Sequence, residues 1–310
     1  MKVIFARSIL NSGITLKNTV AAIGIFDGLH RGHRYLLERM LAQARAFKAK
    51  SMAITFFPHP AHVLRPDVKL GYLMSLPHRL KLLEGLGVDI CLVIHFDKKI
   101  AAIDPESFVR DMLVRRLGVR AIFVGRDFRF GRDRAGDITL LQGLSSVYGY
   151  HMRAVPALMQ GKEPISSTRL RRLVAAGDLI KTKQLLGRPF SVLGKVVRGR
   201  GRGKGLGYPT ANVEYGSHIV PPLGVYAVRV FWKNKTLEGV ANLGLRPSFK
   251  DKDPKIHLET HIFDFKQDLY GQVIEVFFIK KIRDEKKFSS PAELAAQITK
   301  DIVKARRYFR

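Results

Sequence analysis

The stretch IGIFDGLHRGH, residues 23–33, decides the fold of the first half of this 310-residue chain. An apolar run over residues 21–26 predicts a strand, and residues 35–47 continue with the apolar spacing of a helix. His30 and His33 therefore lie at a strand-to-helix turn, where free backbone N–H groups and the helix dipole favour an anion. We interpret this turn as a nucleotide phosphate site at the carboxyl end of a parallel strand.

The spacing of the two histidines supports the phosphate-site interpretation. Gly32 stands between them and would let the backbone come close to a phosphate. Two histidines three residues apart also arise by chance, so a pair of surface histidines on a turn stays open as the alternative. The HxGH pattern resembles the signature of the nucleotidyltransferase superfamily, whose members transfer a nucleotidyl group from a nucleoside triphosphate.

The composition bounds the class of protein. The chain is long enough for two domains, and 46% hydrophobic with 26% charged residues is typical of a globular protein. No apolar run approaches the roughly 20 residues of a membrane helix, and the first residues lack the apolar segment of a signal peptide. Cys91 is the single cysteine, so no internal disulfide can form. We expect a cytoplasmic protein in which Cys91 is a small buried hydrophobe.

The formal net charge of +28 is spread over both halves of the chain. Such a field attracts polyanions without specifying a fold. A nucleic-acid-binding protein that uses the RGRGKG segment, residues 200–205, and surface Lys and Arg is therefore a rival interpretation. We expect at most weak, non-specific binding of polyanions, no specific nucleic acid and no membrane. The sequence does not give the oligomeric state.

The first half alternates apolar strand patterns with helical ones. This alternation predicts the α/β class, with a doubly wound parallel sheet covered by helices on both faces. Asp104 and Pro105 form a good helix start, as a capping residue followed by proline at the first helical position. Strands are expected at 20–26, 51–57, 89–95 and 120–124, and helices at 34–49, 76–86, 105–117, 137–147 and 167–176.

The pattern changes near Gly187, where we place the boundary between a domain of residues 1–186 and a domain of residues 187–310. Short β-type runs separated by Pro/Gly turns then predict an antiparallel barrel or sandwich. A capping box from Ser290 to Glu293 opens one terminal helix. Strands are expected at 190–197, 224–232, 237–243, 256–264 and 273–280.

Two further motifs of the first domain could join the HxGH turn. The loop at residues 125–131, GRDFRFG, directly follows a strand, and residues 165–171, ISSTRLR, place three hydroxyls and then arginine at a helix start. Hydroxyls, helix dipole and guanidinium together suit a triphosphate. The ordinary alternatives are a basic loop with two core phenylalanines and a simple N-cap on a basic helix.

Taken in order, FDGLHRGH, FPHP, GRDFRFG and ISSTRLR resemble the N-terminal module of the prokaryotic bifunctional riboflavin kinase/FMN adenylyltransferases. The resemblance implies that FMN phosphate attacks the α-phosphate of ATP, with His30 and His33 stabilising charge in the transition state. Phe57 departs from the family, which often carries Glu before Pro-His-Pro. The resemblance implies ATP contacts at Gly24, Phe26, Asp27, Gly32, Asp127, Ser167, Thr168 and Arg171, and flavin contacts at Phe57 and Phe128.

The second domain holds a glycine-rich basic run at residues 199–212 that ends in Pro-Thr-Ala-Asn. Its spacing fits neither a Walker A motif nor a dinucleotide fingerprint. Thr210 and Asn212 share one side of an extended segment and can ligate Mg²⁺ through oxygen. Further on, HLETH at residues 257–261 would place two histidines and Glu259 on one face of a strand. A zinc site is one interpretation, and a single carboxylate acting as general base is the better one.

This domain also resembles the riboflavin kinase module of the same family, through GLGYPTANV, PPLGVYAV, GVANLGLRPSF, HLETHIFDFKQDLYG and IRDEKKF. The resemblance implies a small Greek-key β-barrel with a C-terminal helix. It further implies that Thr210 and Asn212 bind Mg²⁺ and ATP phosphates, that Gly205 contacts ATP, that Glu259 takes the proton of the riboflavin 5′-hydroxyl, and that Arg283 approaches the isoalloxazine. The expected cofactors are ATP and Mg²⁺, with riboflavin, FMN and FAD as substrates or products. A flavin enzyme with only one live activity is the nearer rival.

Overall fold

The computed structural model describes residues 1–7, 13–68, 70–199, 202–216, 218–246 and 255–309. Arg200 and Gly201 of the glycine-rich run and residues 247–249 of the GVANLGLRPSF motif lie outside the described residues. The chain divides into two compact units. The sheet unit comprises residues 1–70 and 76–167, and the barrel unit comprises residues 71–75 and 168–310. Residues 168–186 thus group with the barrel, and a domain boundary near Gly187 stays a prediction.

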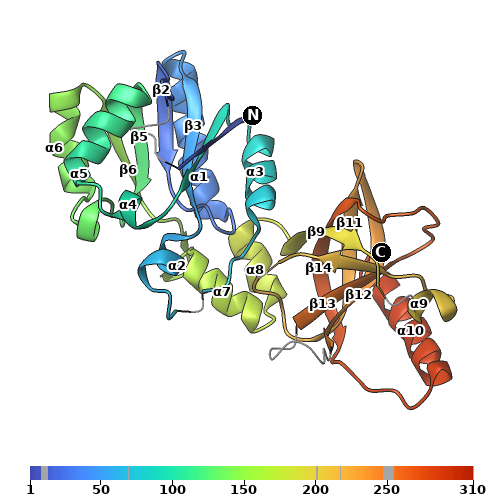
Figure 1. Ribbon diagram of the computed structural model, residues 1–310. Coiled ribbons are helices and arrows are strands. Elements are labelled where there is room, and N and C mark those ends of the chain that lie inside the picture. The colour runs from blue at the N-terminus through green and yellow to red at the C-terminus, as the bar shows by residue number, and fades with distance from the viewer. Residues whose placement is uncertain (8–12, 69, 200–201, 217, 247–254, 310) are drawn as a thin grey trace. The chain divides into compact units, whose positions relative to one another are not determined.

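The sheet unit is built on six parallel strands (Figure 1). The four strands expected from the sequence are present. The two missed strands, β1 and β6, lie at the edges of the sheet, where exposed positions interrupt the apolar run. In chain order the strands are β1 (Lys2–Ala6), β2 (Thr19–Ile23), β3 (Lys50–Phe57), β4 (Ile90–His95), β5 (Val119–Gly125) and β6 (His151–Val155).

The strand order β1-β4-β3-β2-β5-β6 makes the sheet doubly wound. From β2 the chain proceeds to β3 on one side and later crosses to β5 on the other, so the order reverses at the carboxyl ends of β2 and β5. Ligands bind at such switch points. The helices and short elements are α1 (Arg31–Ala46), α2 (Pro60–Leu64), α3 (Leu76–Gly85), α4 (Lys98–Ala101), α5 (Pro105–Ser107), η1 (Phe108–Arg116), η2 (Arg132–Arg134) and α6 (Ile138–Tyr148), followed by a hairpin of β7 (Met159–Gln160) and β8 (Glu163–Pro164).

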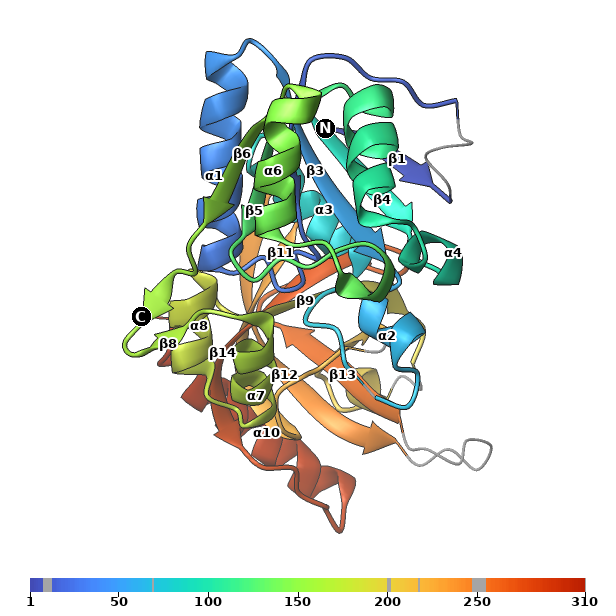
Figure 2. The same cartoon turned by 90° about the vertical axis from the view of Figure 1, so that its left-hand side faces the viewer.

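Helices cover both faces of the sheet, with α5 and α6 on one side and α1 and α3 on the other (Figure 1), and Figure 2 shows α6 in front of the strands. Side chains alternate along β2: Ala21 and Ile23 join a core with Met112 of η1 and Leu141 of α6. Helix α1 packs on β2, β3 and β5. Cys91 in β4 is fully buried, and burial raises the pKa of its thiol to about 12, which confirms its role as a buried hydrophobe.

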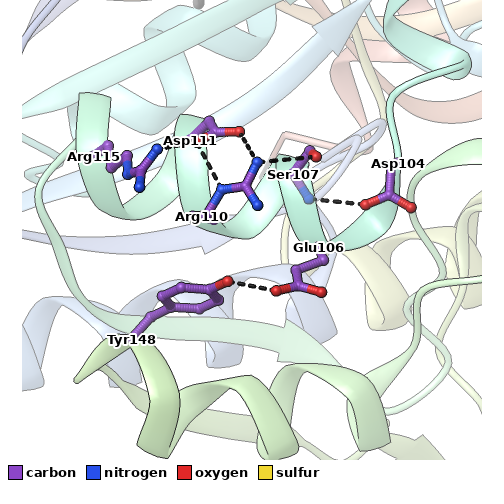
Figure 3. Close-up of polar contacts among 7 residues, drawn as sticks. All are labelled: Asp104, Glu106, Ser107, Arg110, Asp111, Arg115 and Tyr148. Carbon is purple, nitrogen blue, oxygen red and sulfur yellow. Dashed lines mark hydrogen bonds and ion pairs between the residues drawn. The ribbon is translucent and has the colours of Figure 1, made fainter.

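The helix expected at 105–117 begins as predicted and then departs from α geometry. The Asp104 carboxylate accepts a hydrogen bond from the Ser107 N–H at 3.1 Å. From Phe108 the backbone continues as the π-helix η1, a widening that apolar spacing does not reveal. Figure 3 shows the polar side chains of this segment, where Asp111 pairs with both Arg110, at 2.7 Å, and Arg115, at 3.0 Å.

The barrel unit is a closed, antiparallel, six-stranded barrel with the order β10-β13-β12-β11-β14-β9. Strands β11, β12 and β13 are sequential neighbours, and β14 returns to pair with β11. This order is a Greek key. It confirms the expected barrel and decides against a sandwich. The strands are β9 (Ser191–Val197), β10 (Ala211–Glu214), β11 (Gly224–Trp232), β12 (Lys235–Arg246), β13 (Lys255–Ile262) and β14 (Val273–Arg283).

The terminal helix α10 (Pro291–Arg306) begins at the predicted cap. Ser290 accepts a hydrogen bond from the Glu293 N–H at 3.2 Å, and the Glu293 carboxylate accepts from the Ser289 N–H at 2.9 Å. Helix α10 packs on β11, β12 and β14, where Ala305 joins an apolar cluster. The other helices of this unit are α7 (Ser167–Ala175), which starts at the division between the units, α8 (Leu179–Leu186) and α9 (Arg202–Gly205). No helix among the described residues is both long and apolar enough to cross a membrane.

Candidate active sites

The turn after β2 has the backbone of a tight strand-to-helix connection. Three of its residues adopt positive φ: Phe26 at 53°, Gly28 at 84° and Leu29 at 38°. Helix α1 then begins after His30, whose Nδ1 accepts a hydrogen bond from the His33 N–H at 3.2 Å. The HxGH motif therefore forms the first turn of α1, at the carboxyl end of a central strand and beside the switch point of the sheet.

The two histidines form a stacked pair. Their ring centroids are 3.6 Å apart with an interplanar angle of 15°. His30 is only 5% exposed, so the motif is not a pair of surface histidines. The Nδ1 atom of His33 is buried with no hydrogen-bond partner among the described residues. Burial, together with the charges of His30 and Arg79, holds the pKa of His33 well below its usual range, so this ring is neutral near pH 7.

Two glycines make room for aromatic rings in this turn. A Cβ atom on Gly32 would lie 3.2 Å from the His30 ring, and one on Gly24 would lie 3.0 Å from the Phe26 ring. Phe26 itself is fully buried and contacts His33 edge-on, with 5.4 Å between centroids. Its ring therefore supports His33 from the core, and only its main chain is available to a nucleotide.

Sequence reasoning missed Arg79 on α3. This arginine is fully buried, and its Nη1 donates to Thr55 Oγ1 at 3.0 Å and to the Phe56 carbonyl at 3.3 Å, at the end of β3. A buried arginine supplies a fixed positive charge near His33. The signal was available, since Arg79 stands three residues after Leu76 and four before Leu83, on a helix face that apolar residues otherwise occupy.

The remaining predicted residues of the sheet unit gather at the same edge, because β3, β2 and β5 are parallel neighbours. Phe57 ends β3 and is 39% exposed. Asp127 is exposed after β5, and Phe128 stacks on Phe130 with 5.5 Å between centroids. The Ser167 hydroxyl donates to the Asp27 carbonyl at 2.8 Å, which fixes Ser167 against the turn.

The ISSTRLR motif is divided between the units. Ser167 belongs to the sheet unit, whereas Thr168 and Arg171 belong to the barrel unit. Thr168 is exposed, and the Nε atom of Arg171 donates to the Gly71 carbonyl at 2.9 Å. Roles for Thr168 and Arg171 at the triphosphate stay predictions.

The barrel unit contains a cavity of about 430 Å³. Its wall comes from the outer surface of the barrel, the segment around Tyr208 and one face of α10, which Figure 1 shows beside β12. The residues that line it are Gly203, Leu206, Tyr208, Thr210, Asn212, Val225, Val240, Ala241, Asn242, Gly244, Leu245, His257, Glu259, His261, Arg283, Glu285, Lys286, Phe288, Leu294, Ile298 and Asp301.

A polar row crosses three strands in this cavity. Glu259 of β13 stands opposite Asn212 of β10 on one side and opposite Asn242 of β12 on the other. The neighbours of Glu259 in sequence, Leu258 and Thr260, are both only 1% exposed inside the barrel. Strand alternation therefore turns Glu259 outward, into the cavity and between two amides. Asn242 was missed, because its part in the row depends on a strand pairing that the sequence alone does not reveal.

Glycines again provide the space for functional side chains. A Cβ atom on Gly199 would collide with the Asn212 amide, and one on Gly203 would collide with the Tyr208 carbonyl and lie 3.2 Å from Thr210 Oγ1. A Cβ atom on Gly244 would collide with the Glu285 carboxylate. Gly205, by contrast, has no heavy atom near its Cβ position and does not line the cavity, so its predicted contact with ATP stays a prediction.

Arg283 lines the cavity and is held by Asp301 of α10. Its Nε donates to both carboxylate oxygens at 3.0 Å and its Nη2 donates to one of them at 2.8 Å. Asp301 is 4% exposed and also accepts a hydrogen bond from Gln297 at 2.9 Å. The ion pair fixes the guanidinium against the ring of Phe288, 5.6 Å from its centroid. Asp301 was missed, because its partner lies 18 residues away.

The HLETH motif places both histidines beside Glu259 in the cavity lining, as the alternation predicts. Within the described part of the chain, no group of three or more His, Cys, Asp or Glu side chains could hold a metal ion. His261 has another partner, since its Nδ1 lies 2.8 Å from the Pro209 carbonyl. These contacts favour the general-base interpretation of Glu259 over a zinc site.

Comparison with known proteins identifies both units. The family model described as FAD synthetase matches residues 14–169, and the model described as riboflavin kinase matches residues 186–309. A solved structure described as a macrolide-efflux protein from Streptococcus pneumoniae has a TM-score of 0.85 and 28% identity, covering 99% of each chain. That description is not transferred to this chain, because the two family models account for both of its halves.

Curated relatives match over nearly the full length. The bifunctional riboflavin kinase/FMN adenylyltransferase of Escherichia coli strain K12 is 40% identical over 291 residues, which is 94% of this chain and 92% of the relative. The protein of the same name from Buchnera aphidicola subsp. Schizaphis graminum is 36% identical over 305 residues, 98% of each. Since the two family models match both halves of the chain and the two relatives match it over nearly their full length, this chain belongs to the bifunctional riboflavin kinase/FMN adenylyltransferases.

Proposed function

We propose that the chain phosphorylates riboflavin to FMN in the cavity of the barrel unit and adenylylates FMN to FAD at the edge of the sheet unit, with ATP as donor in both steps. The observation that carries the proposal is the row Asn212–Glu259–Asn242, which places one carboxylate in a cavity beside the Thr210 hydroxyl. The stacked His30–His33 pair at the switch point supports the second step.

In the first step Glu259 is the general base. A hydroxyl is a weak nucleophile until a nearby group accepts its proton. The riboflavin 5′-hydroxyl gives its proton to the Glu259 carboxylate, its oxygen bonds to the γ-phosphorus of ATP, and the bond from that phosphorus to the bridging oxygen breaks, so that ADP leaves. The strand register places this carboxylate between the two asparagines.

Thr210 and Asn212 supply the donor set for Mg²⁺ and the phosphates. A hydroxyl and an amide oxygen are hard ligands, and Mg²⁺ in kinases takes few protein ligands besides water and phosphate oxygens. When bound, Mg²⁺ neutralises charge on the phosphates of ATP.

In the second step an oxygen of the FMN phosphate bonds to the α-phosphorus of ATP, and the bond to the β-phosphate breaks to release pyrophosphate. No covalent intermediate with the protein is needed, because positioning and charge stabilisation suffice. His33 is neutral in the free protein, and a triphosphate beside it favours its protonated form. His33 therefore gains positive charge only when the substrate is bound.

The flavin contacts follow from the apolar and cationic surfaces at each site. At the sheet edge, Phe57 and Phe128 offer ring surfaces for the isoalloxazine of FMN. In the barrel cavity, Phe288 and the Arg283 guanidinium, fixed by Asp301, offer a ring surface and donors for riboflavin. A cytoplasmic location and weak, non-specific polyanion binding stay predictions.

The direct test is to incubate the purified protein with riboflavin, ATP and Mg²⁺ and to separate FMN and FAD by chromatography. We expect FMN first and FAD later. FMN without FAD, or FAD formed only from supplied FMN, would mean that one activity alone is live. Tight, sequence-selective binding of RNA or DNA at physiological salt with neither flavin product would favour the nucleic-acid-binding rival.

A further inference from the structure

The histidines of HLETH still need an explanation, because the proposed chemistry uses only Glu259. The contact that distinguishes His261 is with the Pro209 carbonyl, 2.8 Å from its Nδ1 atom. A carbonyl oxygen can only accept, so the His261 Nδ1 carries the hydrogen and donates it. The hydrogen bond joins strand β13 to the segment that leads into β10.

A second set of contacts holds the same segment. The Tyr208 ring lies edge-on to the His261 ring, with 5.7 Å between centroids and an interplanar angle of 87°. The Tyr208 hydroxyl lies 2.7 Å from Thr299 Oγ1 on α10. Because Thr299 donates its own hydrogen to the Ala295 carbonyl at 3.0 Å, the Tyr208 hydroxyl is the donor to Thr299. The Tyr208–Pro209 segment is therefore fixed to β13 on one side and to α10 on the other.

This segment determines where the phosphate ligands stand. Pro209 has no N–H, so its carbonyl is its one backbone group able to make a hydrogen bond. Thr210 follows it directly, and Asn212 then pairs opposite Glu259. A shift of Pro209 would move the Thr210 hydroxyl relative to the Glu259 carboxylate, and small misplacements of catalytic groups are costly.

We propose that His261 is a positioning residue of the riboflavin kinase site, which holds the Pro209 carbonyl through its Nδ1–H and so sets Thr210 and Asn212 against Glu259. Tyr208 and Thr299 support the same segment from α10. This inference rests on the proposed kinase function. It assigns HLETH one base, Glu259, and one histidine that orders the neighbouring strand without contacting the reacting atoms.

The test compares His261→Asn, which keeps an N–H donor at the position of Nδ1, with His261→Leu, which removes it. The readouts are kcat and KM for ATP in riboflavin phosphorylation, and the Kd of riboflavin without ATP, from flavin fluorescence. We expect His261→Leu to lower kcat/KM for ATP by about 10–100-fold, with riboflavin affinity unchanged. His261→Asn should recover most of that loss.

A second pair of variants tests the tie to α10. Tyr208→Phe and Thr299→Val each remove one partner of the same hydrogen bond, so both should raise KM for ATP to a similar, smaller extent, and the double variant should equal either single one. Tyr270→Phe is the matched control, because Tyr270 is 52% exposed and lies outside the cavity. FMN adenylylation, which the other unit performs, checks each preparation.

Four outcomes would overturn the inference. His261→Asn as impaired as His261→Leu would mean that the ring itself, through Nε2, acts on the substrate. A parallel loss of riboflavin affinity would mean that the variant disturbs the whole cavity. If the unsubstituted protein makes FMN and His261→Leu is fully active, the positioning role alone is refuted. If the unsubstituted protein makes no FMN, the kinase function and this role are refuted together.

Discussion

The two units differ in what builds their candidate ATP sites. In the sheet unit the turn between β2 and α1 relies on backbone, with positive φ at Phe26, Gly28 and Leu29 and a histidine pair inside the first helical turn. In the barrel unit the cavity relies on side chains, aligned across three strands by their register. The first site is local in sequence, whereas the second depends on pairings between distant segments.

This difference also separates the roles of charge. The candidate site of the sheet unit combines a helix N-terminus with a partly buried, neutral His33 and a buried Arg79, an arrangement that suits a bound phosphate. The barrel site presents a carboxylate between two amides, which suits proton transfer from a hydroxyl. The first candidate site therefore suits charge stabilisation, and the second suits activation of a nucleophile.

The largest effect is expected from Glu259→Gln. This variant keeps the size of the side chain and removes the proton acceptor, so riboflavin phosphorylation should fall by about 10²–10⁴-fold, the contribution of a general base. Adenylylation of supplied FMN should continue. Glu214→Gln, an exposed carboxylate on β10 outside the cavity, is the matched control. Near-normal FMN formation by Glu259→Gln would remove this residue from the mechanism.

His33→Ala should act on the other reaction. Loss of a group that stabilises charge should lower FAD formation from FMN by about 10²–10³-fold, with riboflavin phosphorylation unchanged. His151→Ala, an exposed histidine in the same unit, controls for the substitution itself. Equal loss of both activities would indicate unfolding or a single shared site, and the comparison between the units would fail.

Gly32→Ala tests whether the sheet site depends on local packing. Its Cβ would lie 3.2 Å from the His30 ring, so the ring must shift, and FAD formation should fall by about tenfold. Gly143→Ala on α6 is the counterpart, since its Cβ position is open and alanine favours a helix by about 1 kcal/mol. It should keep full activity. A fully active Gly32→Ala would show that the stacking of His30 on His33 is dispensable.

The depressed pKa of His33 predicts a smaller effect, on stability. Below the ordinary histidine pKa of about 6.5, His33 binds a proton in the unfolded chain but not in the folded chain. The free energy of unfolding of the sheet unit should therefore fall with decreasing pH, by up to about 1.4 kcal/mol per pH unit from this group. Hydrogen exchange of peptides from β2 and α1 between pH 7.5 and 5.5 measures it.

His33→Gln should remove this part of the pH slope. The chain has one tryptophan, Trp232, which is 6% exposed in the barrel unit, so its fluorescence follows that unit separately. The pH dependence of unfolding that Trp232 fluorescence measures should be the same in the unsubstituted protein and in His33→Gln. A sheet-unit slope that His33→Gln leaves unaltered would place the acid sensitivity elsewhere.

The local site could be predicted from sequence more completely than the distributed one. HxGH, its strand and its helix occupy one continuous stretch, and the structure has both elements. Strand β2 ends at Ile23 rather than at residue 26, and α1 covers residues 31–46 where 34–49 was expected. The edge strands β1 and β6 were not predicted, because partial exposure interrupts their apolar pattern. The π-helix of residues 108–116 was not predicted, because the spacing of apolar residues does not reveal its backbone hydrogen-bond pattern.

In the barrel, the sequence identified the residues that a motif contains and missed those that only pairing brings in. Thr210, Asn212 and Glu259 belong to motifs, and all three line the cavity. Asn242 joins the cavity through strand register, and Asp301 joins it through an ion pair with Arg283, 18 residues away in the sequence. Short β-strands meet partners far along the chain, so neither contact could be read from local pattern.

The central claim is that the two units catalyse two separable steps joined by free FMN. The most direct measurement is complementation: Glu259→Gln and His33→Ala are incubated with riboflavin, ATP and Mg²⁺, each alone and then mixed, and the flavins are separated over time. We predict no new flavin from the first, FMN without FAD from the second, and FAD from the mixture. No FAD from the mixture, when Glu259→Gln converts supplied FMN and His33→Ala makes FMN, would contradict the claim.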